Sequence, residues 1–190
     1  MKFENEKFDE ILTILRRGGI ILYPTDTIWG IGCDATNAAA VERIHTIKNR
    51  PSDKGFVLLV SSIEMLKKYV ADIHPRVQTL VAYHTRPLTV IYDKGIGLPK
   101  NVVAADGSVA IRVTTDPFCR ELIAQFGKPI VSTSANVSGE PFPAYFGEIS
   151  SDILENVDFV VKYKQDSREV GVPSVIARLN DDEELDFLRE

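Results

Sequence analysis

The spacing of hydrophobic residues predicts helices and strands that alternate along the chain. Apolar residues from Phe8 to Leu15 recur at helical spacing and a glycine pair follows, so a helix is predicted over residues 7–17. Asn37 and Asp116 are suited to cap helices over 38–48 and 117–126. A proline at the first turn marks another helix over 75–83. Helices are also expected over 62–70 and near 147–156.

Short apolar or alternating runs predict the strands. They lie at 20–23, 28–33, 56–60, 88–92, 109–113, 129–131, 158–162, 174–179 and 185–188. Strands that alternate with helices indicate an α/β fold. Some strands follow one another without a helix between them, so we expect a mixed sheet rather than a purely parallel one. Because no repeat or linker appears, one domain over residues 1–190 is expected.

The composition is that of an ordinary globular protein, with 190 residues, 44% hydrophobic and 26% charged. No apolar run is long enough for a membrane span and the first residues are highly charged, so a cytoplasmic location is expected. Cys33 and Cys119 are expected to be free thiols. The net charge of −5 argues against nucleic-acid binding by bulk charge. Residues 41–120 nevertheless carry 12 Lys/Arg against 7 Asp/Glu, a balance that can hold phosphates or form a solvated face.

A glycine motif follows the first predicted strands. Residues 30–35 read Gly-x-Gly-x-x-Ala, and Asp53 follows about 20 residues later, as in dinucleotide-binding folds. The helix, however, begins after the motif at Asn37, and Asp53 precedes the next strand instead of ending it. Packing glycines that let a strand approach its neighbours closely are the favoured interpretation.

Lys48 and Arg50 follow the end of a predicted helix in the run Lys48-Asn49-Arg50-Pro51. A lysine in the last turn often only balances the helix dipole. The compact ammonium group of a lysine and the planar guanidinium group of an arginine, both close to a proline, also suit the binding of polyphosphate and carboxylate oxygens. Both interpretations remain open on this motif alone.

A second polar cluster, residues 132–139, reads Ser-Thr-Ser-Ala-Asn-Val-Ser-Gly after a buried strand. It is either a plain turn or a ring of donors at the carboxyl end of a strand, where ligands of open α/β sheets bind. Arg112 lies inside the apolar strand Ala-Ile-Arg-Val, which predicts a partnered or anion-facing guanidinium. The three histidines show no metal-ligand spacing, and no metal ligand is predicted.

Together, the ordered segments YPTDTIWGIGCDA, KNRP, RPLTV, AIRV, STSANVSG and a late Gly-x-x-Ser-Val resemble the YrdC-like family of single-domain threonylcarbamoyl-AMP synthases. The segments run from Gly19 to Ser174 and cover nearly the whole chain. The resemblance implies an α/β fold, a single-domain twisted mixed sheet flanked by helices around a basic cavity.

The resemblance also implies the activity. Family members make threonylcarbamoyl-AMP and pyrophosphate from L-threonine, bicarbonate and ATP with Mg²⁺, and partner proteins transfer the threonylcarbamoyl group to adenosine 37 of tRNA. Lys48 and Arg50 would be the catalytic residues. Substrate and nucleotide would be bound by Thr27, Ser108, Arg112, Ser134, Asn136, Ser174 and Arg189.

One departure from the family motifs concerns threonine. Leu59 stands where the family has a histidine that contacts threonine. This change makes the sequence more similar to the YciO-like paralogues. Two alternative functions remain. One is a non-catalytic, ribosome-associated module that binds double-stranded RNA or tRNA in the basic cavity. The other is a Rossmann oxidoreductase, which rests on the glycine motif alone.

Overall fold

The computed structural model describes residues 7–51 and 55–190 and contains one mixed sheet. The strand order is β7-β1-β2-β6-β3-β5-β4-β8-β9. The strands are β1 (Ile21–Tyr23), β2 (Gly30–Gly32), β3 (Val57–Val60), β4 (Leu88–Tyr92), β5 (Val109–Val113), β6 (Ile130–Ser134), β7 (Phe159–Val160), β8 (Val175–Leu179) and β9 (Leu185–Arg189). Parallel pairs such as β3 with β5 occur beside antiparallel pairs such as β3 with β6. The predicted mixed α/β fold is therefore confirmed.

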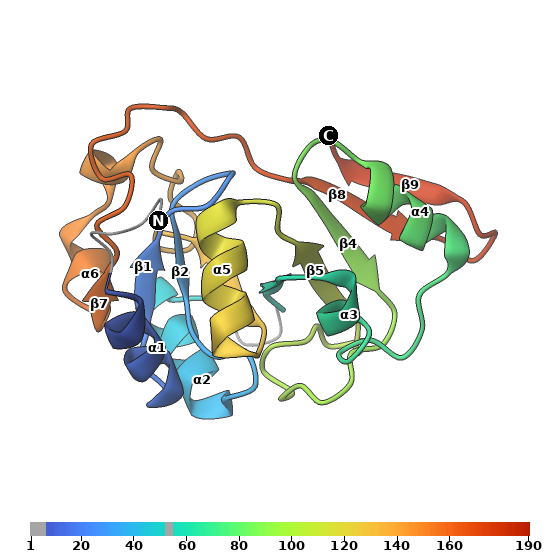
Figure 1. Ribbon diagram of the computed structural model, residues 1–190, viewed down its shortest axis with the longest axis horizontal. Helices are drawn as coiled ribbons and strands as arrows, with labels where there is room; N and C mark the ends of the chain where they lie inside the picture. Colours follow the sequence, from blue (N-terminus) through green and yellow to red (C-terminus); the bar gives the residue numbers. More distant parts are fainter. Residues whose placement is uncertain (1–6, 52–54) are drawn as a thin grey trace.

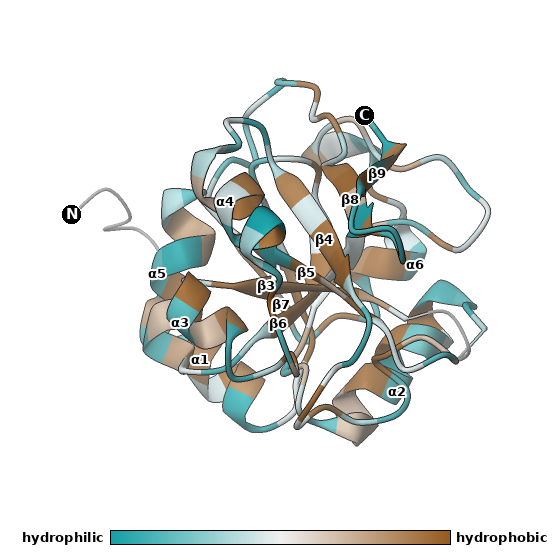
Figure 2. Ribbon diagram, turned by 90° about the vertical axis from the view of Figure 1, so that its right-hand side faces the viewer, coloured by the Kyte–Doolittle hydropathy of each residue, from teal (hydrophilic) through white to brown (hydrophobic). Residues whose placement is uncertain are grey.

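Helices cover both faces of the sheet (Figure 1). They are α1 (Phe8–Arg16), α2 (Ala38–Lys48), α3 (Ile63–Leu66), α4 (Pro75–Tyr83), α5 (Pro117–Phe126) and α6 (Ser151–Leu154), with a 3₁₀ turn at Phe146–Glu148. Apolar residues of α1 and α5 pack on one face, and those of α2, α3, α4 and α6 belong to the larger cluster on the other face. The strands between these layers are largely hydrophobic (Figure 2). No helix among residues 7–51 and 55–190 is long and apolar enough to cross a membrane.

Helices with strong capping residues begin where the sequence predicts. The Asn37 side chain accepts hydrogen bonds from the backbone N–H groups of Ala39 and Ala40, and Asp116 accepts one from Cys119. These acceptors satisfy N–H groups that have no partner within the helix. The predicted bounds 38–48, 75–83 and 117–126 agree with α2, α4 and α5.

Two predicted helices are shorter than expected. The helix over 62–70 is limited to α3, since Val70 leaves the helical path and forms a β-bridge with Gly95. The helix near 147–156 is split into the 3₁₀ turn and α6, because Ile149 is extended and buried between them. In both cases packing overrides local helix propensity.

The strand predicted to end at residue 131 instead continues to Ser134. β6 is paired on both sides, with β2 through Gly30 and Ser134 and with β3 through Val57 and Ser132. The first part of the Ser/Asn cluster is therefore strand rather than loop. Two-sided pairing outweighs the weak strand preference of serine.

The glycine motif serves close packing. A Cβ atom on Gly32 would collide with the Val131 carbonyl oxygen, so only glycine fits there. The following helix, α2, starts at Ala38, after the motif. Asp53 lies outside the described residues. The local geometry therefore lacks the helix N-terminus that a dinucleotide-binding motif places at its glycines.

Candidate active site

A cavity of about 270 Å³ gathers residues from distant parts of the chain. Six of the nine predicted site residues line it, namely Thr27, Arg50, Arg112, Ser134, Ser174 and Arg189. The other lining residues are Ile28, Gly30, Gly55, Phe56, Val57, Ser132, Thr133, Phe142 and Pro173. Among the described residues, the lining contains three arginines and no carboxylate. Its charge therefore favours an anionic ligand.

Arg112 links the cavity to a buried carboxylate behind it. Its Nη1 atom donates a hydrogen bond to Thr27 Oγ1 at 3.1 Å, and Nη2 lies 3.3 Å from Asp26 Oδ1. The Arg112 side chain is only 4% exposed, and such a buried charge requires a partner. Its Nε atom is buried and has no hydrogen-bond partner among the described residues.

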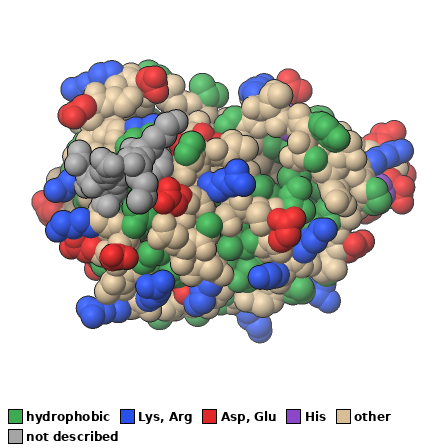
Figure 3. Space-filling view, in the orientation of Figure 1, with side chains coloured by type: hydrophobic (Ala, Val, Ile, Leu, Met, Phe, Trp, Pro, Cys, Tyr) green, Lys and Arg blue, Asp and Glu red, His purple; other side chains and the backbone are tan. Residues whose placement is uncertain are grey.

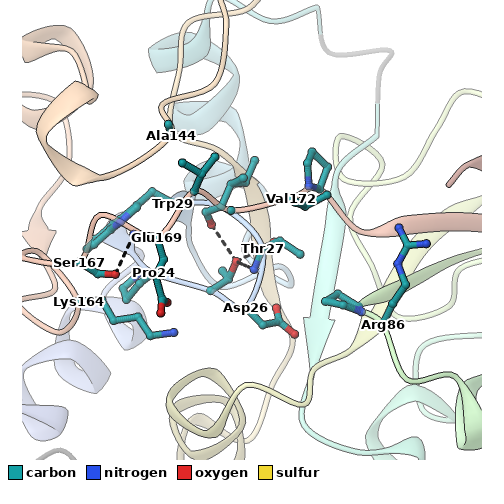
Figure 4. Close-up of a pocket in the computed structure, with 16 residues that line it drawn as sticks. Pro24, Asp26, Thr27, Trp29, Arg86, Ala144, Lys164, Ser167, Glu169 and Val172 are labelled. Carbon is teal, nitrogen blue, oxygen red and sulfur yellow. Dashed lines mark hydrogen bonds between the residues drawn. The ribbon is translucent and has the colours of Figure 1, made fainter.

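The hydroxyl of Thr27 belongs to a short chain of hydrogen bonds (Figure 4). Thr25 Oγ1 donates to the Ile28 carbonyl at 2.8 Å and lies 2.8 Å from Thr27 Oγ1. Because the single Thr25 proton is used on that carbonyl, Thr27 must donate to Thr25. Thr27 also accepts from Arg112 and retains one lone pair. It can therefore accept a hydrogen bond from a ligand N–H or O–H group.

Arg50 also belongs to the cavity lining. Its Nη2 atom donates to the Gly55 carbonyl at 2.8 Å, and its guanidinium carbon lies 5.1 Å from the centre of the Phe56 ring. A hydrogen bond and a cation–π contact fix the guanidinium plane. A planar group held in this way is suited to phosphate or carboxylate oxygens.

Arg189, at the end of β9, is held by Ser174. Its Nε donates to the Ser174 carbonyl at 2.8 Å and Nη2 donates to Ser174 Oγ at 3.3 Å. Ser174 Oγ is in turn 2.8 Å from Thr89 Oγ1 on β4. Burial, and secondly the charge of Arg112, lower the pKa of Arg189 from its usual value. An anion in the cavity would relieve the repulsion between these two guanidinium groups.

Lys48 is not among the cavity-lining residues. It is 2% exposed, and its Nζ donates to the carbonyl oxygens of Ser134 and Asn136, each at 2.5 Å. Burial, and secondly the charge of Arg50, lower its pKa to about 8. In this structure Lys48 supports the backbone that carries Ser134.

Two further predicted residues are also outside the lining. Ser108 is buried just before β5, where its N–H donates to Asp106 Oδ1 at 2.9 Å. The Asn136 side-chain amide donates to the carbonyl oxygens of Val137 and Glu140 and so stabilises the turn after β6. The structure brings neither side chain to the cavity, because both are engaged in local turns.

Leu59 is the strand neighbour of Arg112 in the parallel pair of β3 and β5. It is fully buried in the cluster formed by α1 and α5 and is not part of the cavity lining. The hydrophobic side chain therefore extends the core beside the site.

A second cavity of about 300 Å³ adjoins the Thr27 loop (Figure 4). It shares Thr27, Ile28 and Pro173 with the first cavity. Its charged lining residues are Asp26, Glu169, Arg86 and Lys164. Gly171 forms part of the shared partition, where a Cβ atom would collide with the Thr27 carbonyl oxygen. Acidic and basic charges are therefore balanced in this second cavity.

Sequence reasoning missed several residues that organise the site. Thr25 and Thr89 orient the hydroxyls of Thr27 and Ser174, and Gly171 permits the close approach of two backbone segments. The only sequence signal for Thr25 is its place in the Pro-Thr-Asp-Thr break. Thr89 and Gly171 belong to the segments RPLTV and Gly-x-x-Ser-Val, but their roles depend on contacts with Ser174 and Thr27 in distant segments.

The described side chains provide no cage for a metal ion. They contain no group of three or more His, Cys, Asp or Glu residues that could hold one. Mg²⁺ often binds through substrate phosphates and waters instead of a dedicated protein site. The described lining of arginines and hydroxyls supplies donors for anions and no acidic ligand for a metal ion.

Comparison with known proteins identifies the family. Residues 13–190 match the Sua5/yciO/yrdC family profile, which is described as telomere recombination. A threonylcarbamoyl-AMP synthase of Xanthomonas oryzae is 34% identical over 185 residues, covering 96% of both chains. The chain therefore belongs to the Sua5/YciO/YrdC family.

Solved structures have the same fold. A variant of P. abyssi Sua5 superposes with a TM-score of 0.87 at 26% identity, over 96% of this chain and 56% of that one. This chain thus spans little more than half the length of that Sua5. E. coli YciO superposes with a TM-score of 0.82 at 26% identity, over 96% of this chain and 88% of that one.

Proposed function

We propose that this chain is an enzyme that forms threonylcarbamoyl-AMP and pyrophosphate from L-threonine, bicarbonate and MgATP. The observation that carries the proposal is the cavity with Arg50, Arg112 and Arg189 and no carboxylate in its described lining. The names of relatives that match over most of the chain support this assignment. In this proposal, partner proteins transfer the product to adenosine 37 of tRNA.

The reaction requires a carbamate oxygen of carboxylated threonine to attack the α-phosphorus of ATP. One bond forms between that oxygen and phosphorus, and the bond to the departing pyrophosphate breaks. No covalent enzyme intermediate is needed, so positioning and charge neutralisation supply the rate enhancement. Mg²⁺ supplies charge neutralisation on the phosphates when it enters with ATP.

Arg50 and Arg189 are assigned to the phosphate and carboxylate oxygens, because both guanidinium groups line the cavity and are fixed by backbone carbonyls. Thr27 is assigned to an N–H or O–H group of threonine, through its remaining lone pair. Ser134 and Ser174 add hydroxyl groups to the same lining. Arg112 holds Thr27 in place and adds positive charge to the cavity lining.

Lys48 is assigned to positioning, through the two carbonyl oxygens that it holds. A Lys48→Ala variant tests this role. Loss of a buried side chain with two hydrogen bonds should lower stability as well as turnover.

The decisive experiment measures pyrophosphate release with ATP, Mg²⁺ and bicarbonate, with and without L-threonine. The proposal expects release that depends on threonine and is lost in Arg50→Ala. Binding of ATP without threonine-dependent release would reject the synthase and favour a non-catalytic nucleotide- or RNA-binding module. L-Serine as a parallel substrate tests whether Leu59 has altered the choice of amino acid.

A further inference from the structure

His45 is a buried histidine of α2 outside the cavity lining. Its imidazole lies between two backbone carbonyl groups, with Nδ1 3.3 Å from the Arg50 oxygen and Nε2 2.9 Å from the Asn101 oxygen. A neutral imidazole donates to one of these oxygens, and an imidazolium donates to both. The side chain therefore connects the end of α2 to two other segments.

The backbone of Arg50 is held by His45 at both ends. Helix α2 closes with Asn49 in the left-handed conformation, and the Arg50 N–H donates to the His45 carbonyl at 2.9 Å. The Arg50 carbonyl faces the His45 imidazole. Both peptide groups that flank the Arg50 Cα atom are thus fixed by one residue.

The side chain of Arg50 depends on the same histidine through Phe56. The His45 and Phe56 rings lie 4.4 Å apart between centroids, and the Arg50 guanidinium lies 5.1 Å from the Phe56 centroid. The Phe56 N–H donates to the Val102 carbonyl at 3.1 Å, in the loop that His45 contacts through Asn101. Displacing the imidazole would therefore disturb both the backbone and the stacking surface of Arg50.

We propose that His45 is a positioning residue for Arg50, which sets the orientation of the guanidinium in the anion-binding cavity. The inference rests on the proposed function only for its choice of MgATP as the ligand. Its structural content concerns the orientation of Arg50 and can be measured without any turnover.

The test compares His45→Phe, which keeps a ring against Phe56 but loses both hydrogen bonds, with His45→Asn, whose amide nitrogen replaces Nδ1. The Arg50 Nε–Hε NMR signal, assigned by its loss in Arg50→Lys, is expected to shift or broaden in His45→Phe. MgATP binding by calorimetry is expected to weaken about tenfold in His45→Phe and no more than about threefold in His45→Asn. Unfolding curves of both variants show whether the fold is retained.

A double-mutant cycle separates positioning from general destabilisation. If His45 acts through Arg50, His45→Phe should cause little further loss of MgATP affinity in the Arg50→Lys background. An Arg50 signal and an affinity that are both unchanged in His45→Phe would overturn the inference, and so would full additivity with Arg50→Lys. Failure of wild-type protein to release pyrophosphate would instead reject the synthase proposal, and the NMR comparison would still decide the role of His45.

Discussion

The two cavities beside the Thr27 loop differ in charge although they share part of their walls. The described lining of the first contains Arg50, Arg112 and Arg189 and no carboxylate, whereas that of the second has two acidic and two basic residues. Asp26 lines the second cavity and pairs with Arg112, which lines the first. A single ion pair thus stabilises the partition and leaves the first cavity with an excess of positive charge.

The face of the molecule shown in Figure 3 does not repeat this contrast. On the face shown in Figure 3, basic and acidic side chains are interspersed around hydrophobic ones. Local concentration of arginines inside one cavity therefore matters more for anion binding than the net charge of −5.

Arg112→Ala should have the largest effect, because it removes a donor from the first cavity and leaves Asp26 unpaired behind it. We expect turnover to fall at least about 100-fold and the free energy of unfolding to fall by about 3–5 kcal/mol. Pyrophosphate assays and urea denaturation measure the two effects.

The matched control is Arg178→Ala, which breaks the exposed pair with Asp93 and should cost no more than about 1 kcal/mol. The double variant Arg112→Met/Asp26→Leu should regain much of the stability without regaining turnover. A wild-type unfolding midpoint in Arg112→Ala would show that the ion pair does not stabilise the partition.

The second prediction compares one arginine from each cavity. Arg50→Ala should reduce turnover about 100-fold, since it removes an anion-binding group. Arg86→Ala, in the charge-balanced cavity, should change turnover by no more than about threefold. The thermal melt of each variant controls for folding. Equal losses in the two variants would mean that the substrates occupy both cavities.

How much of this arrangement the sequence predicts depends on the range of the interactions. Asn37 and Asp116 cap helices through contacts two or three residues away, so their positions were predictable. Arg50 and Ser134 were found because they belong to compact motifs. Lys48 is buried because its amine binds a carbonyl oxygen of β6, whereas Arg50 lines the cavity. This difference could not be predicted without knowing how β6 pairs with β2 and β3.

The predicted residues that lie outside the lining have the same explanation. Ser108 and Asn136 belong to motifs of the right composition, but the Ser108 N–H and the Asn136 amide nitrogen are used in local turns. Thr89, which orients Ser174 from a position 85 residues away, belongs to no polar cluster in the sequence. Registers between distant strands cannot be obtained from local patterns.

The third prediction concerns pH and Lys48. Its pKa is about 8 in the folded protein and 10.5 in the unfolded chain, so the unfolded state binds more protons between these values. Stability relative to Lys48→Met should therefore rise with pH from about 8 to 10.5, by about 3 kcal/mol in total. Urea denaturation of both proteins from pH 7 to 11 measures the difference. A difference that stays constant over this range would contradict the burial of a charged Lys48 amine.

The smallest expected effects are those of replacing Thr27 and Thr25, the two threonines of the loop beside the cavities. Thr27→Val removes the lone pair assigned to threonine, so the KM for threonine should rise about tenfold with little change in kcat. Thr25→Val leaves that oxygen in place but removes the acceptor for the Thr27 hydroxyl and N–H. It should raise KM only about two- to threefold and reduce stability by about 1 kcal/mol. Steady-state kinetics with threonine varied at saturating ATP separates the two variants. If Thr25→Val raised KM as much as Thr27→Val, the orientation of the Thr27 hydroxyl, rather than its presence, would be what substrate binding requires.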